Sequence, residues 1–261
     1  MHHLLAYNAS LGVAAANADV AMVADQEFTA RNNHLLTQDD FRLLAAAYLA
    51  ASATGARISA PTLNGFARHH IWPIHRSATI PDDPRLQDMR MNPLRLPAGE
   101  EIAVEASNDL GAATERSTAF LWLAGPSWST TIPTGIQRLT VRATYSITTT
   151  AYSWSALGAL TFAENLRGGR YTIVGLNVFD ANSLAVRLVF GRGNMVNGRR
   201  MRPGVLCQNA VSDRPNPVFM GGLGVYGEFL TIEPPQVEVY ATNTAAHAGE
   251  CRVDLIYSGG Q

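Results

Sequence analysis

The stretch 137–148, QRLTVRATYSIT, decides the fold class of this chain. Apolar and polar residues alternate along it, and the apolar set is Leu139, Val141, Ala143, Tyr145 and Ile147. Successive side chains of a β-strand point to opposite faces of the sheet. The alternation therefore predicts a strand with one buried face and one polar face.

Similar runs follow one another along the rest of the sequence. They predict strands at 101–106, 118–124, 171–179, 184–190, 237–241 and 251–257, with weaker candidates at 157–162 and 205–208. Turn-forming clusters such as Ser107-Asn108-Asp109 and Pro234-Pro235 separate the runs. Because no amphipathic helix lies between them, the pattern favours a mainly β protein with an antiparallel β-sandwich over a parallel α/β sheet.

Residues 1–56 are predicted to form an α-helical N-terminal arm. The stretch is rich in Ala and has no Pro. Thr37 is suited to cap a helix, with Asp40 in the first turn, and Gly55 is suited to end it. Between them an apolar stripe recurs at helical spacing: Phe41, Leu44, Ala45, Tyr48 and Leu49.

Two further segments complete the predicted organisation. Residues 57–97 contain six prolines and are expected to be an extended connection: Pro61, Pro73, Pro81, Pro84, Pro93 and Pro97. Residues 98–261 are expected to form the β-sandwich domain. Its loops at 191–204 and 209–227 exceed the usual hairpin length, which favours contact with a neighbour or a ligand.

The charged residues are few and contain no lysine. Only 16% of the chain is charged and 47% is hydrophobic, against about 25% charged in an average domain. The absence of Lys excludes Schiff-base and P-loop lysine chemistry. A GC-rich genome would explain Arg in place of Lys, but not the low total charge. The sparse charge favours a protein that hides much of its surface against other subunits.

The sequence predicts a soluble chain. No stretch approaches the roughly 20 apolar residues that span a bilayer. Ala16-Asn17-Ala18 is similar to a signal-peptide cleavage site, but no Lys or Arg precedes Arg31. Cys207 and Cys251 lie in strand-like runs and are expected to be buried free thiols, with a single cross-strand disulfide as the alternative.

No catalytic residue, metal ligand or cofactor site is predicted, and we expect the chain not to be an enzyme. Adjacent His69 and His70 would point to opposite sides of an extended chain, so at most one can join His75 in a metal site. The glycine-rich run 221–227 lacks the strand–turn–helix context of a phosphate-binding loop. Carboxylate groups that could serve a glycosidase are Glu100, Glu101 and Glu105, or Glu228, Glu233 and Glu238.

The candidate contact site is a basic loop that contains Arg192, Arg199, Arg200 and Arg202. Guanidinium groups bind carboxylates and phosphates bidentately. We favour a contact between subunits, made with an acidic patch such as Asp82, Asp83 and Asp88. Contact with nucleic acid and a solvated loop without a role remain open alternatives; the loop lacks the aromatic residues on which bases stack.

The run PLRLPAGEEI at 93–102, continued by Val104 and by AFLWL at 119–123, is similar to the opening strands of a jelly-roll domain. The whole layout resembles the coat proteins of icosahedral viruses, especially tailless phages, in which an N-terminal arm precedes a single jelly roll. The first 30 residues contain no Lys or Arg, which favours shell or membrane contacts of the arm over genome contacts.

This resemblance implies a jelly-roll-like β-sandwich and a self-assembling capsid subunit. Its partners would be copies of itself and other shell proteins, and its location the virion, after a soluble stage in the host cytoplasm. The alternatives are a carbohydrate-binding or adhesion module on a β-sandwich and, third, a glycoside-active enzyme.

Overall fold

The chain is mainly β in the computed structural model, and none of the described residues lies in an α-helix. The structure describes residues 2–11, 20–24, 35–36, 40–50, 53–61, 69–71, 86–108, 115–126, 128–191, 195–196, 199–209 and 223–260. Over these ranges, no helix that could cross a membrane is found.

The chain divides into two compact units. The C-terminal unit comprises Met1–Leu4, Ile80–Asp83 and Ser127–Gln261, and the N-terminal unit comprises Leu5–Thr79 and Pro84–Pro126. These limits differ from the predicted segments 1–56, 57–97 and 98–261. The difference arises because pairing between strands far apart in the sequence, rather than local composition, decides which residues pack together.

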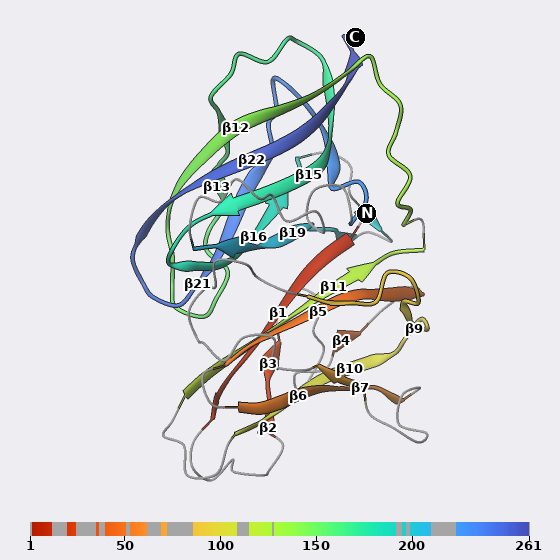
Figure 1. Cartoon of the computed structure of the whole chain (residues 1–261), viewed down its shortest axis with the longest axis vertical. Coiled ribbons are helices and arrows are strands. Elements are labelled where there is room, and N and C mark those ends of the chain that lie inside the picture. Colours follow the sequence, from red (N-terminus) through yellow and green to blue (C-terminus); the bar gives the residue numbers. More distant parts are fainter. Residues whose placement is uncertain are drawn as a thin grey trace. The chain divides into compact units, whose positions relative to one another are not determined.

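In the described part of the N-terminal unit the strands form two sheets (Figure 1). One has the order β3-β1-β11-β5-β8, with β9 also paired to β5. Its strands are β1 (His2–Leu11), β3 (Val23–Ala24), β5 (Phe41–Leu49), β8 (Gln87–Asp88), β9 (Leu94–Leu96) and β11 (Glu115–Ala124). The other has the order β2-β10-β6-β7, with β4 paired to β10. Its strands are β2 (Val20–Ala21), β4 (Leu35–Leu36), β6 (Ala53–Ser59), β7 (His69–Ile71) and β10 (Glu101–Asn108).

Met22 joins these two sheets. The residues before it, in β2, pair with β10, and the residues after it, in β3, pair with β1. The Met22 side chain is fully buried, and its N–H donates to the Val104 carbonyl at 2.8 Å. A single buried residue thus carries the chain from one sheet to the other.

The predicted helical arm is wrong for the residues that the structure describes. Phe41–Leu49, which has helical spacing, is strand β5, antiparallel to β11 and also paired with β8 and β9. Every residue of β5 except Arg42 is buried, so both faces of the strand are apolar. A short apolar run without alternation fits a buried strand and a buried helix equally well, and here the neighbouring strands decide.

In the described part of the C-terminal unit, nine strands form one sheet in the order β13-β21-β16-β19-β15-β22-β12-β14, with β20 also on β15. They are β12 (Gln137–Thr148), β13 (Gly158–Ala159), β14 (Thr161–Phe162), β15 (Arg170–Phe179), β16 (Ser183–Val189), β19 (Gly204–Gln208), β20 (Gly227–Leu230), β21 (Gln236–Ala241) and β22 (Ala246–Gly259). A separate two-stranded ribbon consists of β17 (Met195–Val196) and β18 (Arg199–Arg200).

This sheet nearly closes on itself. Its two end strands, β13 and β14, are separated along the chain by Leu160 alone, so the chain itself links one end of the sheet to the other. Leu160 is 2% exposed and belongs to the core that the sheet encloses. The pairing is antiparallel except between β15 and β19, which are parallel over two residue pairs. The sheet is therefore mixed.

The alternation in 137–148 is confirmed. Val141, Ala143, Tyr145 and Ile147 are buried and Leu139 is partly buried, while the polar residues between them are exposed. The strand pairs with β22 over its whole length, and β12, β22 and β15 lie side by side in Figure 1. The other predicted strands are also strands: the weaker candidate at 205–208 lies in β19, and the one at 157–162 is two short strands, β13 and β14, rather than one.

Candidate functional site

The four candidate arginines have different surroundings. Arg192 lies outside the described residues. Arg199 and Arg200 form β18, and the Arg200 side chain is exposed. Arg202 turns inward: its guanidinium binds the Glu238 carboxylate at 2.5 Å, and its side chain is 19% exposed. Of the two arginines whose side-chain exposure the structure describes, Arg200 and Arg202, it is Arg200 whose exposure suits a contact with a partner.

Glu238 is shared by two arginines in the C-terminal unit. Its Oε2 accepts a hydrogen bond from Arg187 Nε at 2.5 Å, and its Oε1 accepts one from Arg202 at 2.5 Å. The side chains of Arg187 and Glu238 are 2% and 8% exposed. A carboxylate between two guanidinium groups leaves one net positive charge. In a buried setting, removal of one partner is strongly destabilising.

The sheet register places this cluster. Arg187 of β16 lies directly opposite Glu238 of β21 on one side and Gly204 of β19 on the other. The Arg187 guanidinium lies 4.1 Å from the centre of the Trp154 ring, which favours a cation there. Arg187 was not among the predicted site residues; its one sequence signal is a charge inside the apolar run 184–190.

The first residues of the chain pack beside this cluster. The Leu4 N–H donates to the Arg202 carbonyl at 3.0 Å, and the Arg202 N–H donates to His3 Nδ1 at 3.0 Å. His2 and His3 are fully buried, and the His2 ring meets the Tyr226 ring edge-on at 4.8 Å. Burial lowers the pKa of His2 to about 3. The pKa of His3 is also well below its usual value, because of burial and the neighbouring Arg187 and Arg202.

The carboxylates considered for a glycosidase are dispersed among arginine contacts. Glu105 binds Arg57 at 2.9 Å, and Glu228 lies 3.8 Å from Arg170. Of the acidic patch proposed as a partner for the basic loop, Asp82 and Asp83 lie outside the described residues. Asp88 forms two hydrogen bonds with the side chain of Arg90, at 2.7 and 2.8 Å. That pairing lowers the Asp88 pKa.

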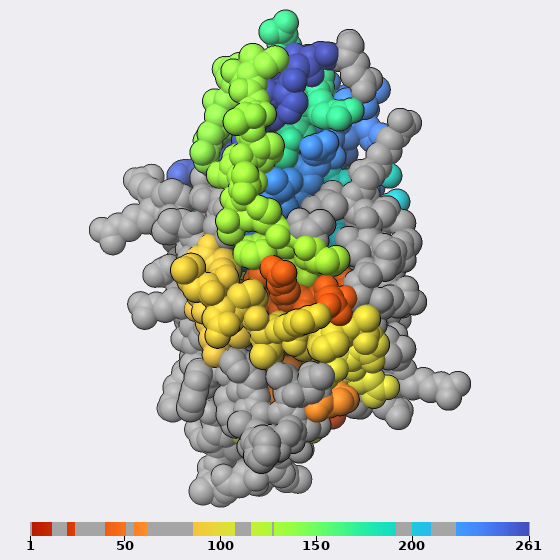
Figure 2. Space-filling view, turned by 90° about the vertical axis from the view of Figure 1, so that its right-hand side faces the viewer, coloured from red at the N-terminus to blue at the C-terminus, as the bar shows by residue number. Residues whose placement is uncertain are grey.

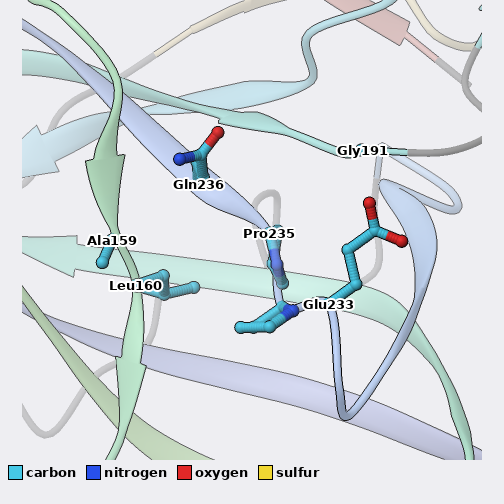
Figure 3. A pocket seen from close by; sticks show the side chains of 7 residues that line it. Ala159, Leu160, Gly191, Glu233, Pro235 and Gln236 are labelled. Atoms are coloured by element: carbon cyan, nitrogen blue, oxygen red, sulfur yellow. The ribbon is translucent and has the colours of Figure 1, made fainter.

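Glu233 borders a small cavity of about 380 Å³ in the C-terminal unit (Figure 3). The walls are mostly apolar: Ala159, Leu160, Gly191, Pro234, Pro235 and Gln236. The Glu233 side chain extends toward Gly191, where an added Cβ would lie 2.1 Å from its carboxylate oxygen. One carboxylate beside apolar walls could accept a small apolar or cationic group. Among the described residues that line the cavity, none supplies the second carboxylate that glycoside hydrolysis uses.

A second buried polar group surrounds Asp180. Its carboxylate accepts hydrogen bonds from Tyr145 at 2.9 Å and from Ser183 at 2.5 Å, and it lies 3.7 Å from His247. Burial raises the Tyr145 pKa well above its usual value. Asp180 binds the Ser183 hydroxyl directly rather than through the histidine, so the order of groups in a Ser-His-Asp triad is not reproduced. The cluster ties the end of β15 to β16 and β12.

Cys207 and Cys251 are free and buried, as expected. Both are register partners of Val178, one from β19 and one from β22. Adjacent strands are about 4.8 Å apart, so the two cysteines are separated by roughly 10 Å, beyond the reach of a disulfide. Burial raises the pKa of both thiols. The disulfide alternative is therefore excluded.

Within the described ranges, no group of three or more His, Cys, Asp or Glu side chains is arranged to hold a metal ion. His69 and His70 lie in β7, whereas His75 is outside those ranges. Gly221 and Gly222 are outside them as well, and the run that follows leads into strand β20 rather than into a helix.

Comparison with solved structures finds similarity to a phage coat protein. No protein-family model and no curated protein matches the chain. Among solved structures, the chain is similar to the major capsid protein P2 of bacteriophage PM2, with 12% identity, 100% of this chain and 99% of that chain covered, and a TM-score of 0.25. The superposition is loose, so we infer the function from the chain's own side chains.

Proposed function

We propose that this chain is a self-assembling shell protein, a capsid subunit built from jelly-roll-like β units. The observation that carries the proposal is the set of large apolar side chains that the described residues expose: Val23, Met91, Ile136, Leu157 and Ile232. Met91 is 98% exposed and Ile232 is 88% exposed. Burial of such a side chain against another copy would contribute about 1.5–3 kcal/mol.

Sparse charge supports the same proposal. Single exposed apolar residues are normal on a monomer, but here they coincide with a chain that is only 16% charged. Figure 2 shows the segment 128–148, in lime green, at the surface of the C-terminal unit; Ile136 within this segment is 72% exposed. In a shell, the same few contacts recur between all copies. Modest contacts per copy then add up to a stable assembly.

The partners under this proposal are other copies of the chain, and the location is the virion. Arg200 is exposed and suits a contact with an acidic neighbour or with nucleic acid. The carbohydrate-binding alternative has less support, because every described Phe, Tyr and Trp side chain is buried or partly buried. Sugar-binding surfaces usually offer an open aromatic face.

The test is assembly of the purified chain, observed by sedimentation and by electron microscopy. Wild type should form large symmetric particles at raised protein concentration. Met91→Asp should lose them while its far-UV circular dichroism stays unchanged, because a charge would have to be buried at the contact. Asn92→Asp is the matched control: it adds the same charge at the next exposed residue and should assemble like wild type.

A wild-type chain that stays monomeric under all assembly conditions would overturn the proposal. If the Met91→Asp and Ile232→Asp variants both assemble like wild type, the role given to the exposed apolar residues is overturned. If an Arg200→Gln variant forms intact particles that package nucleic acid poorly, Arg200 contacts the genome rather than a neighbouring subunit.

A further inference from the structure

Two adjacent histidines are buried where β1 begins, in the part of the strand that belongs to the C-terminal unit. His2 and His3 have no exposed surface, although His is a residue that usually keeps some contact with water. The charged side chains that lower the His3 pKa are both cations, Arg187 and Arg202. This environment accepts neutral imidazole and resists imidazolium.

The hydrogen bond that His3 accepts also requires a neutral imidazole, on geometric grounds alone. The Arg202 backbone N–H donates to His3 Nδ1 at 3.0 Å, which requires a lone pair on that nitrogen. Protonated imidazole carries hydrogen on both ring nitrogens, so two donors would then face each other. The adjacent Leu4 N–H bond to the Arg202 carbonyl closes the same short ladder. Loss of one bond therefore weakens the other.

The groups facing the two rings come from several elements. The positive charges of Arg187, from β16, and of Arg202 disfavour a proton on His3. The Glu238 carboxylate from β21 is hydrogen-bonded to these two arginines. Tyr226 packs against the His2 ring. The backbone groups of Gly204 and Leu223 favour a proton on His2, but burial outweighs them.

We propose that His2–Leu4 is an acid-released latch, which docks on the C-terminal unit while both histidines are neutral and detaches when they take up protons. Gly204 shapes its seat, since an added Cβ would lie 2.8 Å from the Leu4 side chain and 2.4 Å from the Val186 carbonyl oxygen. The latch does not depend on the proposed shell function, because every contact that it uses lies within one chain.

The direction of the pH dependence follows from linkage. A histidine whose pKa is lowered by docking binds more protons when detached, so docking is strongest above the ordinary value near 6.5 and weakens as pH falls. With both groups neutral when docked, the docking constant falls on the order of several hundredfold between pH 7 and pH 5. One such histidine alone gives roughly 25-fold over the same interval.

Amide hydrogen exchange tests the latch. Protection of the peptide spanning 2–8, corrected for intrinsic rates, should fall steeply in wild type between pH 7 and pH 5. A double variant, His2→Phe with His3→Asn, keeps a ring against Tyr226 and an acceptor oxygen for the Arg202 N–H, and should lose the pH dependence. Each single variant should retain roughly 25-fold. His247→Gln, a buried histidine away from the latch, is the matched control and should behave like wild type.

Three results would overturn the latch: a wild-type change below about threefold, an unchanged slope in the double variant, or equal loss of protection in 246–259, which would mean global unfolding. If the double variant does not dock at pH 7, the His2 and His3 ring resonances of wild type decide by NMR titration. Midpoints below the ordinary histidine value support the latch, and midpoints at or above that value overturn it.

Discussion

Replacement of Glu238 by glutamine would remove a carboxylate that Arg187 and Arg202 share while keeping its size. Both of its oxygens are engaged at 2.5 Å, and its side chain is 8% exposed. The amide nitrogen of the new side chain would place a donor against one of the two guanidinium groups. Because Arg187 is buried and cannot turn to water, we expect a loss of about 3–5 kcal/mol in the free energy of unfolding.

The assay uses the two thiols, which both lie in the C-terminal unit and are its internal probe of unfolding. Urea-dependent exposure of Cys207 and Cys251 to a thiol reagent reports that unit alone. With a slope of about 2 kcal/mol per molar urea, the midpoint should fall by roughly 2 M. Glu228→Gln is the matched control, since Glu228 and Arg170 are 56% and 49% exposed and 3.8 Å apart; its loss should stay below about 1 kcal/mol.

A second change separates charge burial from lost packing. In the Glu238→Gln background, Arg187→Met removes the buried cation whose partner carboxylate has been replaced, and leaves a flexible apolar side chain beside Trp154. The double variant should therefore be more stable than Glu238→Gln alone, because an apolar group needs no counter-charge. A loss in Glu238→Gln no larger than that in Glu228→Gln would refute the reasoning, and so would further destabilisation by Arg187→Met.

Two more predictions concern the same unit. Cys207 and Cys251, whose thiol pKa values are raised by burial, should remain unreactive toward a thiol reagent at pH 8 in the folded chain and react fully in urea; rapid reaction of the native protein would contradict the described burial. Gly249→Ala should lower the free energy of unfolding by about 1–3 kcal/mol, because its Cβ would lie 2.2 Å from the ring of Tyr145. In urea titrations, Ala248→Ser on the exposed face is the control, and equal stability of the two variants would count against this packing.

Strands with one solvent-exposed face could be predicted from the sequence. In 137–148 each polar residue marks the solvent side and each apolar residue the core side, so the period of two is written in the residues themselves. The weaker run 157–162 does not follow this rule: its residues form two short strands, β13 and β14, at the two ends of a sheet, with Leu160 buried and the apolar Leu157 47% exposed. What the residues could not show is that Leu160 between them brings those ends together.

Strands that are buried on both faces could not be predicted in this way. Phe41–Leu49 is buried on both sides by neighbouring strands, and its apolar residues therefore follow no period that separates strand from helix. Its three consecutive alanines, Ala45 to Ala47, also favour a helix by intrinsic propensity. Only the pairing with β11, β8 and β9 identifies the segment as a strand.

The candidate site shows the same division between local and long-range information. Composition alone establishes that the chain has many arginines, no lysines and little charge. Tertiary structure decides that Arg202 binds Glu238, that both histidines near the start of the chain are buried beside it, and that Val178 separates the two cysteines. Periodicity depends on neighbours in the sequence, whereas ion pairs, buried imidazoles and thiol spacing depend on sheet register between residues far apart in the sequence, which no local pattern encodes.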